Sequence, residues 1–152
     1  MPNTKNGKDY EKELETKISN LLKGKGYSIE SQVPTLEHFG KKRLDILATK
    51  KISRTWISKL LRNKESFKIP IEIKYQEVQG TAEEKIPFDA ISLINYVNHH
   101  KDCKIGYIVL GGNGFSSKID EFINGTLKPF IKGLNKIQIL REEQFLKEID
   151  KL

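Results

Sequence analysis

The sequence predicts an α/β fold in which a mixed central β-sheet is flanked by helices. Two observations support this prediction. Strand-like segments come first as a hairpin-like set, and strands then alternate with helices along the chain. A hydrophobic content of 37% in 152 residues is also enough to bury the core of one domain. We therefore expect a single domain over residues 1–152.

The first element should be an amphipathic helix, followed by a strand. Apolar residues recur at three- and four-residue steps in DYEKELETKISNLLKGKGY, residues 9–27. Asp9 is the expected N-cap, and Gly24 or Gly26 the expected end of the helix. The strand covers YSIESQV, residues 27–33, and a loop leads from it to the next strand.

Two further strands complete the first half of the sheet. KRLDILATK, residues 42–50, is expected to place Leu44 and Ile46 on one face. FKIPIEIKYQ, residues 67–76, has Pro70 near its beginning, where a missing hydrogen-bond donor is tolerable. These strands form the set that precedes the alternating segment of the chain.

In the second half, Pro87 suits the first turn of a helix. The segment 116–134 is expected to be helical with a break near Gly125 or Pro129. In chain order we expect a helix over 87–100, an apolar strand and glycine turn over 104–114, this helical segment, a short strand over 135–140 and a terminal helix over 142–152.

The composition favours a polyanionic partner in a reducing compartment. The formal net charge is +7, which suits phosphate contacts, although a lysine-rich proteome would give the same balance. No run of about 18 apolar residues is present, so we expect no membrane span. The polar N-terminus does not resemble a secretory signal, and there is one cysteine. We expect a cytoplasmic, nucleoid-associated protein.

Basic residues are concentrated between Lys41 and Lys64, where Asp45 is the only acid. Within this window lies a basic insertion at about 50–66, whose core SRTWISKLLRN has helical apolar spacing. The insertion could dock in a DNA groove or build a dimer, or it could pack Trp56 on the core. The expected DNA contacts are Lys41, Lys42, Arg43, Arg54, Lys59, Arg62 and Lys85.

Charged and polar side chains share one face of the strand IEIKYQ. Glu72, Lys74 and Gln76 alternate with apolar residues, and a strand has a side-chain period of two. Asp45 lies inside another apolar strand that could be the neighbour, in which case Asp45 and Glu72 could meet. Two carboxylates in a partly dry site need a positive charge between them, such as a divalent metal. The alternative is that these residues form the solvated face of a sheet.

These residues resemble the motif of the PD-(D/E)XK nuclease superfamily, with LD at 44–45 and EIK at 72–74. The element order also resembles the superfamily's αβββαβ core. The resemblance implies that Asp45 and Glu72 bind a catalytic Mg²⁺, which Mn²⁺ can replace, and that Lys74 serves the nucleophilic water. GKDYEKEL resembles the first-helix motif and makes Glu11 a further catalytic candidate, with Glu15 as second choice. Gln76 matches another recurring position, whereas Leu44 replaces the usual proline.

The longer string IKYQEVQGTAEEKIPFD resembles small type II restriction endonucleases of this superfamily. The resemblance implies a Mg²⁺-dependent, site-specific endonuclease that hydrolyses phosphodiester bonds in double-stranded DNA. Cutting both strands would most simply need a homodimer or higher homo-oligomer. A homing endonuclease or a Holliday-junction resolvase on the same core, and a non-catalytic DNA-binding module, are the alternatives.

Overall fold

A five-stranded mixed sheet forms the centre of the computed structural model, which describes residues 6–35, 42–52 and 66–152. The strands lie in chain order across the sheet: β1 (Ser28–Pro34), β2 (Arg43–Lys51), β3 (Ser66–Tyr75), β4 (Gly106–Gly111) and β5 (Ile137–Arg141). The pairs β1–β2 and β2–β3 are antiparallel, whereas β3–β4 and β4–β5 are parallel. The predicted α/β fold with a mixed sheet is confirmed.

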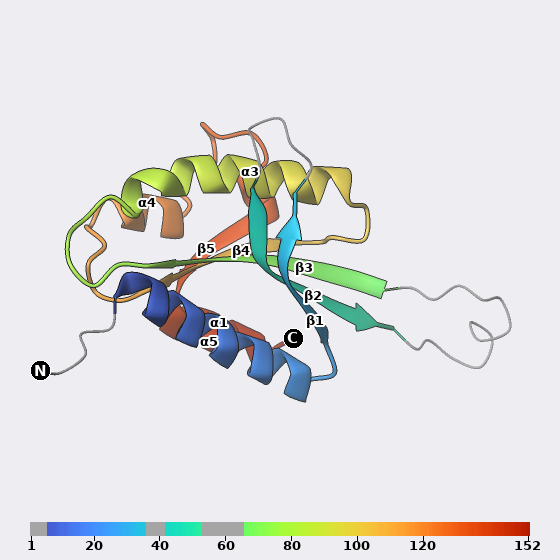
Figure 1. The fold of residues 1–152 in the computed structure, drawn as a ribbon. Helices are drawn as coiled ribbons and strands as arrows, with labels where there is room; N and C mark the ends of the chain where they lie inside the picture. The colour runs from blue at the N-terminus through green and yellow to red at the C-terminus, as the bar shows by residue number, and fades with distance from the viewer. Residues whose placement is uncertain (1–5, 36–41, 53–65) are drawn as a thin grey trace, which may run out of the picture.

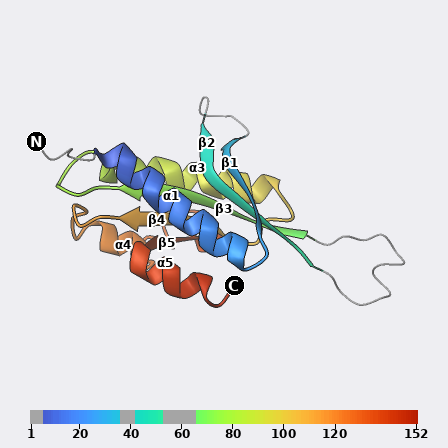
Figure 2. The same ribbon diagram turned by 60° about the horizontal axis from the view of Figure 1, so that its bottom comes forward.

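Helices cover both faces of the sheet (Figure 1). α3 (Ile86–His99) lies on one face, and α1 (Gly7–Gly24) and α5 (Glu142–Ile149) lie on the other. Figure 2 shows α1 and α5 side by side across the sheet. Each face has its own apolar cluster, one built with α3 and the other with α1 and α5. The polar side chains of β3 can therefore lie beneath α3, while its apolar side chains pack against α1 and α5.

The side chains of β3 alternate between the two faces of the sheet, as the sequence predicted. Ile71 and Ile73 are buried in the cluster under α1 and α5. Glu72 and Lys74 project to the opposite face, where Lys74 forms an ion pair with Asp89 of α3. β3 is the central strand of the sheet, and its Glu72 and Lys74 lie beyond the last pair with β2, where β3 pairs with β4 alone.

The β1–β2 hairpin separates from β3 at Asp45. β2 pairs with β3 as far as Ile46 opposite Ile71, and beyond that point it pairs with β1 alone. Opposite Asp45, Gln32 has a left-handed backbone with φ of 55°. This conformation is uncommon for a residue with a side chain, and it twists the hairpin away from β3. We call this point of separation the fork.

The fork makes the predicted face of β2 wrong. Leu44 packs in the cluster under α3, whereas Ile46 packs in the cluster under α1 and α5. A regular strand would place these two residues on one face. The twist at Asp45 breaks that period, so the side chains on either side of it point to opposite faces.

The first helix begins earlier than predicted, with Asn6 and not Asp9 as its N-cap. The Asn6 side chain accepts a hydrogen bond from the backbone N–H of Asp9, and the Asp9 side chain accepts one from Asn6. This reciprocal capping box places the acid on the third residue of the helix. The predicted end is confirmed, since the last helical residue is Gly24.

The helix expected over 116–134 is mostly absent. α4 (Ile119–Ile123) is a single short helix, and the 3₁₀ turns η1 (Glu83–Lys85) and η2 (Leu134–Lys136) precede α3 and β5. Gly125 and Gly133 adopt left-handed backbone conformations with φ of 74° and 85°. These glycines turn the chain twice where the sequence predicted one break, because each takes a conformation that a helix cannot contain.

Some of the predicted organisation falls outside the described residues. Most of the basic insertion at about 50–66 lies there, and the single domain over residues 1–152 stays a prediction. Within the described ranges, no helix is both long and apolar enough to cross a membrane.

Candidate active site

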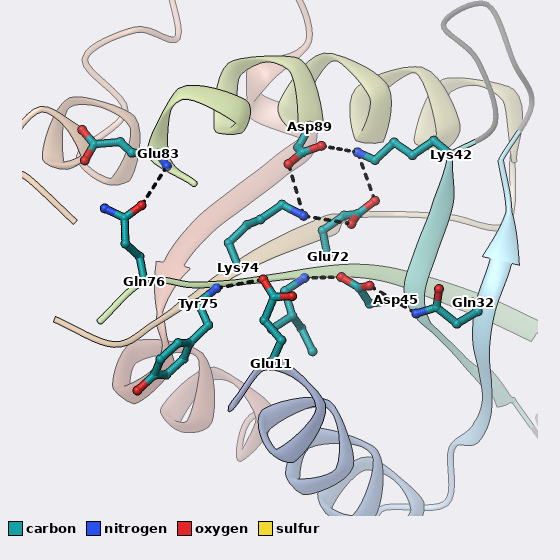
Figure 3. Close-up of polar contacts among 11 residues, drawn as sticks. Glu11, Gln32, Lys42, Asp45, Glu72, Lys74, Tyr75, Gln76, Glu83 and Asp89 are labelled. Carbon is teal, nitrogen blue, oxygen red and sulfur yellow. Dashed lines mark hydrogen bonds and ion pairs between the residues drawn. The ribbon is translucent and has the colours of Figure 1, made fainter. Parts of the chain in front are cut away.

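Asp45 occupies the fork and takes over a backbone hydrogen bond that β2 no longer makes. Its Oδ2 accepts from the N–H of Ile73 at 2.7 Å, and its Oδ1 accepts from the Gln32 side chain at 3.4 Å. Beyond the last β2–β3 pair, the N–H groups on this edge of β3 have no strand to bond. Asp45 is thereby fixed beside the residue that follows Glu72 (Figure 3).

Glu11 accepts a backbone hydrogen bond in the same way, further along the free edge of β3. It projects from the second turn of α1, and its Oε1 accepts from the N–H of Tyr75 at 3.2 Å. Burial raises the pKa of Glu11, and the bond from Tyr75 and the charge of Lys74 only partly oppose this rise. Two of the predicted catalytic carboxylates, Asp45 and Glu11, thus lie along the same free edge of β3.

Glu72 and Lys74 lie on the α3 side of the sheet, in a group of four charged residues (Figure 3). The Glu72 side chain is 2% exposed, and its oxygens lie 3.2 Å from the Nζ of Lys42 and 4.0 Å from the Nζ of Lys74. Asp89 lies 2.6 Å from Lys42 Nζ and 3.3 Å from Lys74 Nζ. We call Lys42, Glu72, Lys74 and Asp89 the charge ring, because each acid contacts both lysines.

Glu72 is poorly compensated despite these neighbours. Its Oε1 is buried and accepts no hydrogen bond, so Lys42 serves it only as an ion-pair partner. Burial raises the pKa of Glu72 to about 7, and the charges of Lys42 and Lys74 only partly oppose that effect. A buried carboxylate with an unsatisfied oxygen has capacity for a further positive partner.

The donor atoms at the fork fit a hard divalent cation. Asp45, Glu72 and Glu11 offer only oxygen ligands, which Mg²⁺ prefers, and Glu72 has an oxygen free of hydrogen bonds. Within residues 6–35, 42–52 and 66–152, no three acidic, histidine or cysteine side chains gather closely enough to hold a metal by themselves. Mg²⁺ commonly takes one or two carboxylates and completes its shell with water and phosphate oxygens.

Asp45 and Glu72, which the sequence analysis said could meet if their strands are neighbours, lie on the neighbouring strands β2 and β3. Burial is the main cause of the raised pKa of Glu72, and the charge of Asp45 raises this pKa further. Asp45 bonds the backbone of Ile73, while Glu72 turns toward α3. The structure thus places Asp45 of β2 beside the β3 residue that follows Glu72.

Gln76 connects two loops beyond the end of β3. Its side chain is buried, donates to the carbonyl oxygen of Gly114 at 2.8 Å and accepts from the N–H of Glu83 at 3.2 Å. Both ends of the amide are used to join the glycine turn after β4 to the 3₁₀ turn before α3. A catalytic role for Gln76 stays a prediction, since these bonds also explain it as a structural residue.

Replacing Gln76 by alanine should lower the free energy of unfolding by about 1–2 kcal/mol, because it leaves two partly buried backbone groups without the side chain that bonds them. Urea unfolding followed by circular dichroism measures this loss. Gln79→Ala, an exposed amide on the same loop, is the control and should change stability by less than about 0.5 kcal/mol. Equal stability of the two variants would contradict the structural role of Gln76.

The residues predicted to contact DNA fall into three groups. Lys42 turns inward, with 18% of its side chain exposed, and belongs to the charge ring. Arg43 and Lys85 are exposed, at the start of β2 and in η1. Lys41, Arg54, Lys59 and Arg62 lie outside the described residues. DNA contact stays a prediction for all of them, and for Lys42 the structure adds an alternative.

Two residues at the site were missed by the sequence analysis. Asp89 shares an apolar helical stripe with Ile86, Ala90 and Leu93, and that spacing marks it as a buried acid. Gln32 lies opposite Asp45 in β1, where its left-handed backbone accompanies the fork. No sequence signal distinguishes Gln32, because glutamine has no special preference for that conformation.

Comparisons with known proteins give one strong match. The family model of the PD-(D/E)XK nuclease superfamily domain matches residues 6–151. One solved structure, the crystal structure of a protein of unknown function, AF1548, has a TM-score of 0.48 and 11% identity. That match takes in 84% of this chain and 55% of the other, so this chain spans little more than half of that protein's length. None of the curated proteins matches the sequence.

Proposed function

Because the chain belongs to the PD-(D/E)XK nuclease superfamily, we propose that it is a Mg²⁺-dependent endonuclease that hydrolyses phosphodiester bonds in double-stranded DNA. Membership supports a nuclease; the metal, the substrate and the restriction-type specificity are our proposal. The observation that supports it best is the fork, where the Asp45 side chain bonds the backbone of β3 beside the buried Glu72 and the partly buried Lys74. An apolar sheet gains no stability from such a set, since each buried charge costs free energy.

Asp45 and Glu72 are the residues that would hold the metal. When bound there, Mg²⁺ would stabilise the negative charge that develops on the phosphate and lower the pKa of a water. Mn²⁺ has the same preference for oxygen ligands and should substitute. Glu11 lies at the next position along the free edge of β3, where it is placed to accept a hydrogen bond from a water.

Lys74 acts as an ammonium group. Burial lowers the pKa of Lys74, but the nearby carboxylates, Asp89 and Glu72 first and then Asp45 and Glu11, together outweigh this effect and leave the pKa above its ordinary value. The side chain is therefore protonated at neutral pH and has three donors but no acceptor. It can orient the attacking water and stabilise the charge of the phosphate, but in this state it cannot take a proton from the water.

The substrate and assembly follow from charge and size. The net charge of +7 favours a polyanion, and Arg43 at the start of β2 and Lys85 in η1 are exposed. A single fork can cut one strand at a time, so we propose a homodimer or higher homo-oligomer for double-strand cleavage. Such an enzyme would act in the cytoplasm, at the nucleoid.

Incubation of phage and closed circular plasmid DNA with Mg²⁺, with Mn²⁺ or with EDTA tests this function. We expect discrete fragments with either metal and none with EDTA, and sequencing of their ends gives the recognition site. A short exact site supports a restriction enzyme and a long degenerate site a homing endonuclease. Cleavage of four-way junctions in preference to linear duplex would point to a resolvase.

The same experiment can disprove the proposed nuclease activity. If no duplex or junction is cut with either metal, and DNA binding persists, the chain is a DNA-binding module on a nuclease fold. Binding should then weaken with salt, because phosphate contacts release counterions.

A further inference from the structure

Asp89 is a buried carboxylate that belongs to none of the strand motifs. It lies in the first turn of α3 and is 5% exposed, on the face of the helix that packs against the sheet. An acid in the first turn of a helix normally gains from the helix dipole while it remains in solvent. Burial removes the solvent and costs several kcal/mol unless the charge is paired. Asp89 therefore needs its partners in the charge ring.

Both lysines of the charge ring lie closer to Asp89 than to Glu72. Lys74 Nζ lies 3.3 Å from Asp89 Oδ2 and 4.0 Å from Glu72 Oε2. Lys42 Nζ lies 2.6 Å from Asp89 Oδ1 and 3.2 Å from Glu72 Oε1. Each ammonium group is thus closer to Asp89 than to Glu72, although Glu72 shares a strand face with Lys74 (Figure 3).

We propose that Asp89 is a positioning residue that holds the Lys74 ammonium in place for DNA cleavage. This inference rests on the proposed function. Once Glu72 is engaged by a metal, its oxygens are no longer available to Lys74, and Asp89 is the acid of the ring that remains. The long lysine side chain has several rotatable bonds, so a fixed partner on a rigid helix limits the positions that its Nζ can take.

Charge balance in the ring leads to the same role. With both acids ionised, two lysines and two carboxylates sum to zero. Without the carboxylate of Asp89, two ammonium groups would share one acid, and the repulsion between them would displace one of them. Lys42 is the last residue before β2 and can move toward solvent, whereas the backbone of Lys74 is held within β3 by its pairing with β4. Asp89 thus keeps both amines near the fork.

The simpler alternative is that Asp89 only anchors α3 to the sheet. In that case its loss would reduce stability, and cleavage would fall only as far as the folded fraction falls. A positioning role predicts a lower rate per folded molecule and an altered environment of Lys74. These two quantities separate the alternatives.

The test compares Asp89→Asn with Asp102→Asn. Asp102 also pairs with a lysine of β3, Lys68 at 2.9 Å, but at the other end of the strand, so it is a matched control. NMR of the lysine Cε–Hε groups in the metal-free protein reports on the Lys74 ammonium independently of activity. Single-turnover cleavage with Mg²⁺ gives the rate per folded molecule, and a binding titration with EDTA gives the affinity for DNA.

We expect Asp89→Asn to shift the Lys74 resonance and to cut about 10–100-fold more slowly at unchanged DNA affinity, as for other partners that orient a reacting group. Asp102→Asn should change neither. Asp89→Glu keeps the charge one methylene further out, and it should shift Lys74 and cut at an intermediate rate. If Asp89→Asn does not fold, the Lys74 resonance and the cleavage rate of Asp89→Glu test the positioning role instead.

Wild-type cleavage rates in the folded Asp89 variants, with the Lys74 resonance unmoved, would overturn the inference and leave the nuclease intact. Absence of cleavage by the wild-type protein would instead overturn the proposed function, and the positioning role with it.

Discussion

Replacing Lys74 by methionine is expected to lower the single-turnover rate of DNA cleavage by about 10²–10³-fold, the range for loss of a donor that stabilises the charge of the transition state. Methionine has a similar length but no charge and no donor. The reacting water would lose the ammonium group that orients it, and the phosphate would lose a positive partner. DNA affinity measured with EDTA should change little, because the effect arises in the transition state.

Lys68→Met is the matched control for this variant. Lys68 also lies on β3 and is ion-paired with an aspartate, but it lies far along the strand from the fork. It should cut DNA at the wild-type rate. Because Lys74→Met leaves two buried acids with one lysine, circular dichroism must show that it folds, and Lys74→Arg provides a second variant that keeps the charge. Equal cleavage by Lys74→Met and Lys68→Met would contradict the role of Lys74.

Glu72→Gln is expected to be more stable than the wild-type protein at pH 8 when no metal is present, by about 1–3 kcal/mol. Burial raises the pKa of Glu72 from 4.5 to about 7 in the folded protein. The folded state thus holds this proton more tightly than the unfolded state does. The stability that the protonated carboxyl contributes is fully present below about pH 4.5, and it is lost as the pH rises through about 7.

Urea unfolding in EDTA at pH 5 and pH 8 measures this effect. The difference between Glu72→Gln and wild type should be small at pH 5 and should favour the variant at pH 8, because glutamine stays neutral at both. Glu142→Gln removes a carboxylate from an exposed pair with Lys17 and should change stability by less than about 1 kcal/mol at either pH. If the free energies of unfolding of Glu72→Gln and wild type differ by the same amount at pH 5 and pH 8, burial does not raise the pKa of Glu72.

Together these two predictions describe a site that costs stability. A buried acid that ionises only with difficulty is unfavourable in the metal-free fold, but a divalent cation favours its charged form. Glu72→Gln should therefore be more stable at pH 8 and unable to cut DNA. Such an opposition between stability and activity is expected where a site is built for its reaction.

The sequence predicted the central strand well because its information is local. Alternation alone placed Glu72 and Lys74 on one face of β3 and Ile71 and Ile73 on the other. The order of elements predicted the mixed sheet, since two strands without a helix between them favour an antiparallel pair. The family assignment rested on these same residues, and the family model confirms it.

Features that depend on distant partners could not be predicted in this way. The fork reverses the faces of Leu44 and Ile46, and it arises from a twist at Gln32 that no local preference encodes. Lys42 looked like a DNA contact because it lies in a basic run, but it turns inward because Glu72 and Asp89 are there to receive it. The role of Asn6 as N-cap could have been predicted from the sequence, since an asparagine three residues before an acid fits a capping box.

The most direct test of the central claim is whether Asp45 and Glu72 bind the metal. Free Mn²⁺ can be measured by electron paramagnetic resonance while it is titrated into the DNA-free protein. We predict one or more sites in the wild-type protein and in Asp102→Asn, and at least roughly tenfold weaker binding in Asp45→Asn and in Glu72→Gln. Equal Mn²⁺ binding by all four proteins, or no binding by the wild type, would contradict a metal centre at the fork.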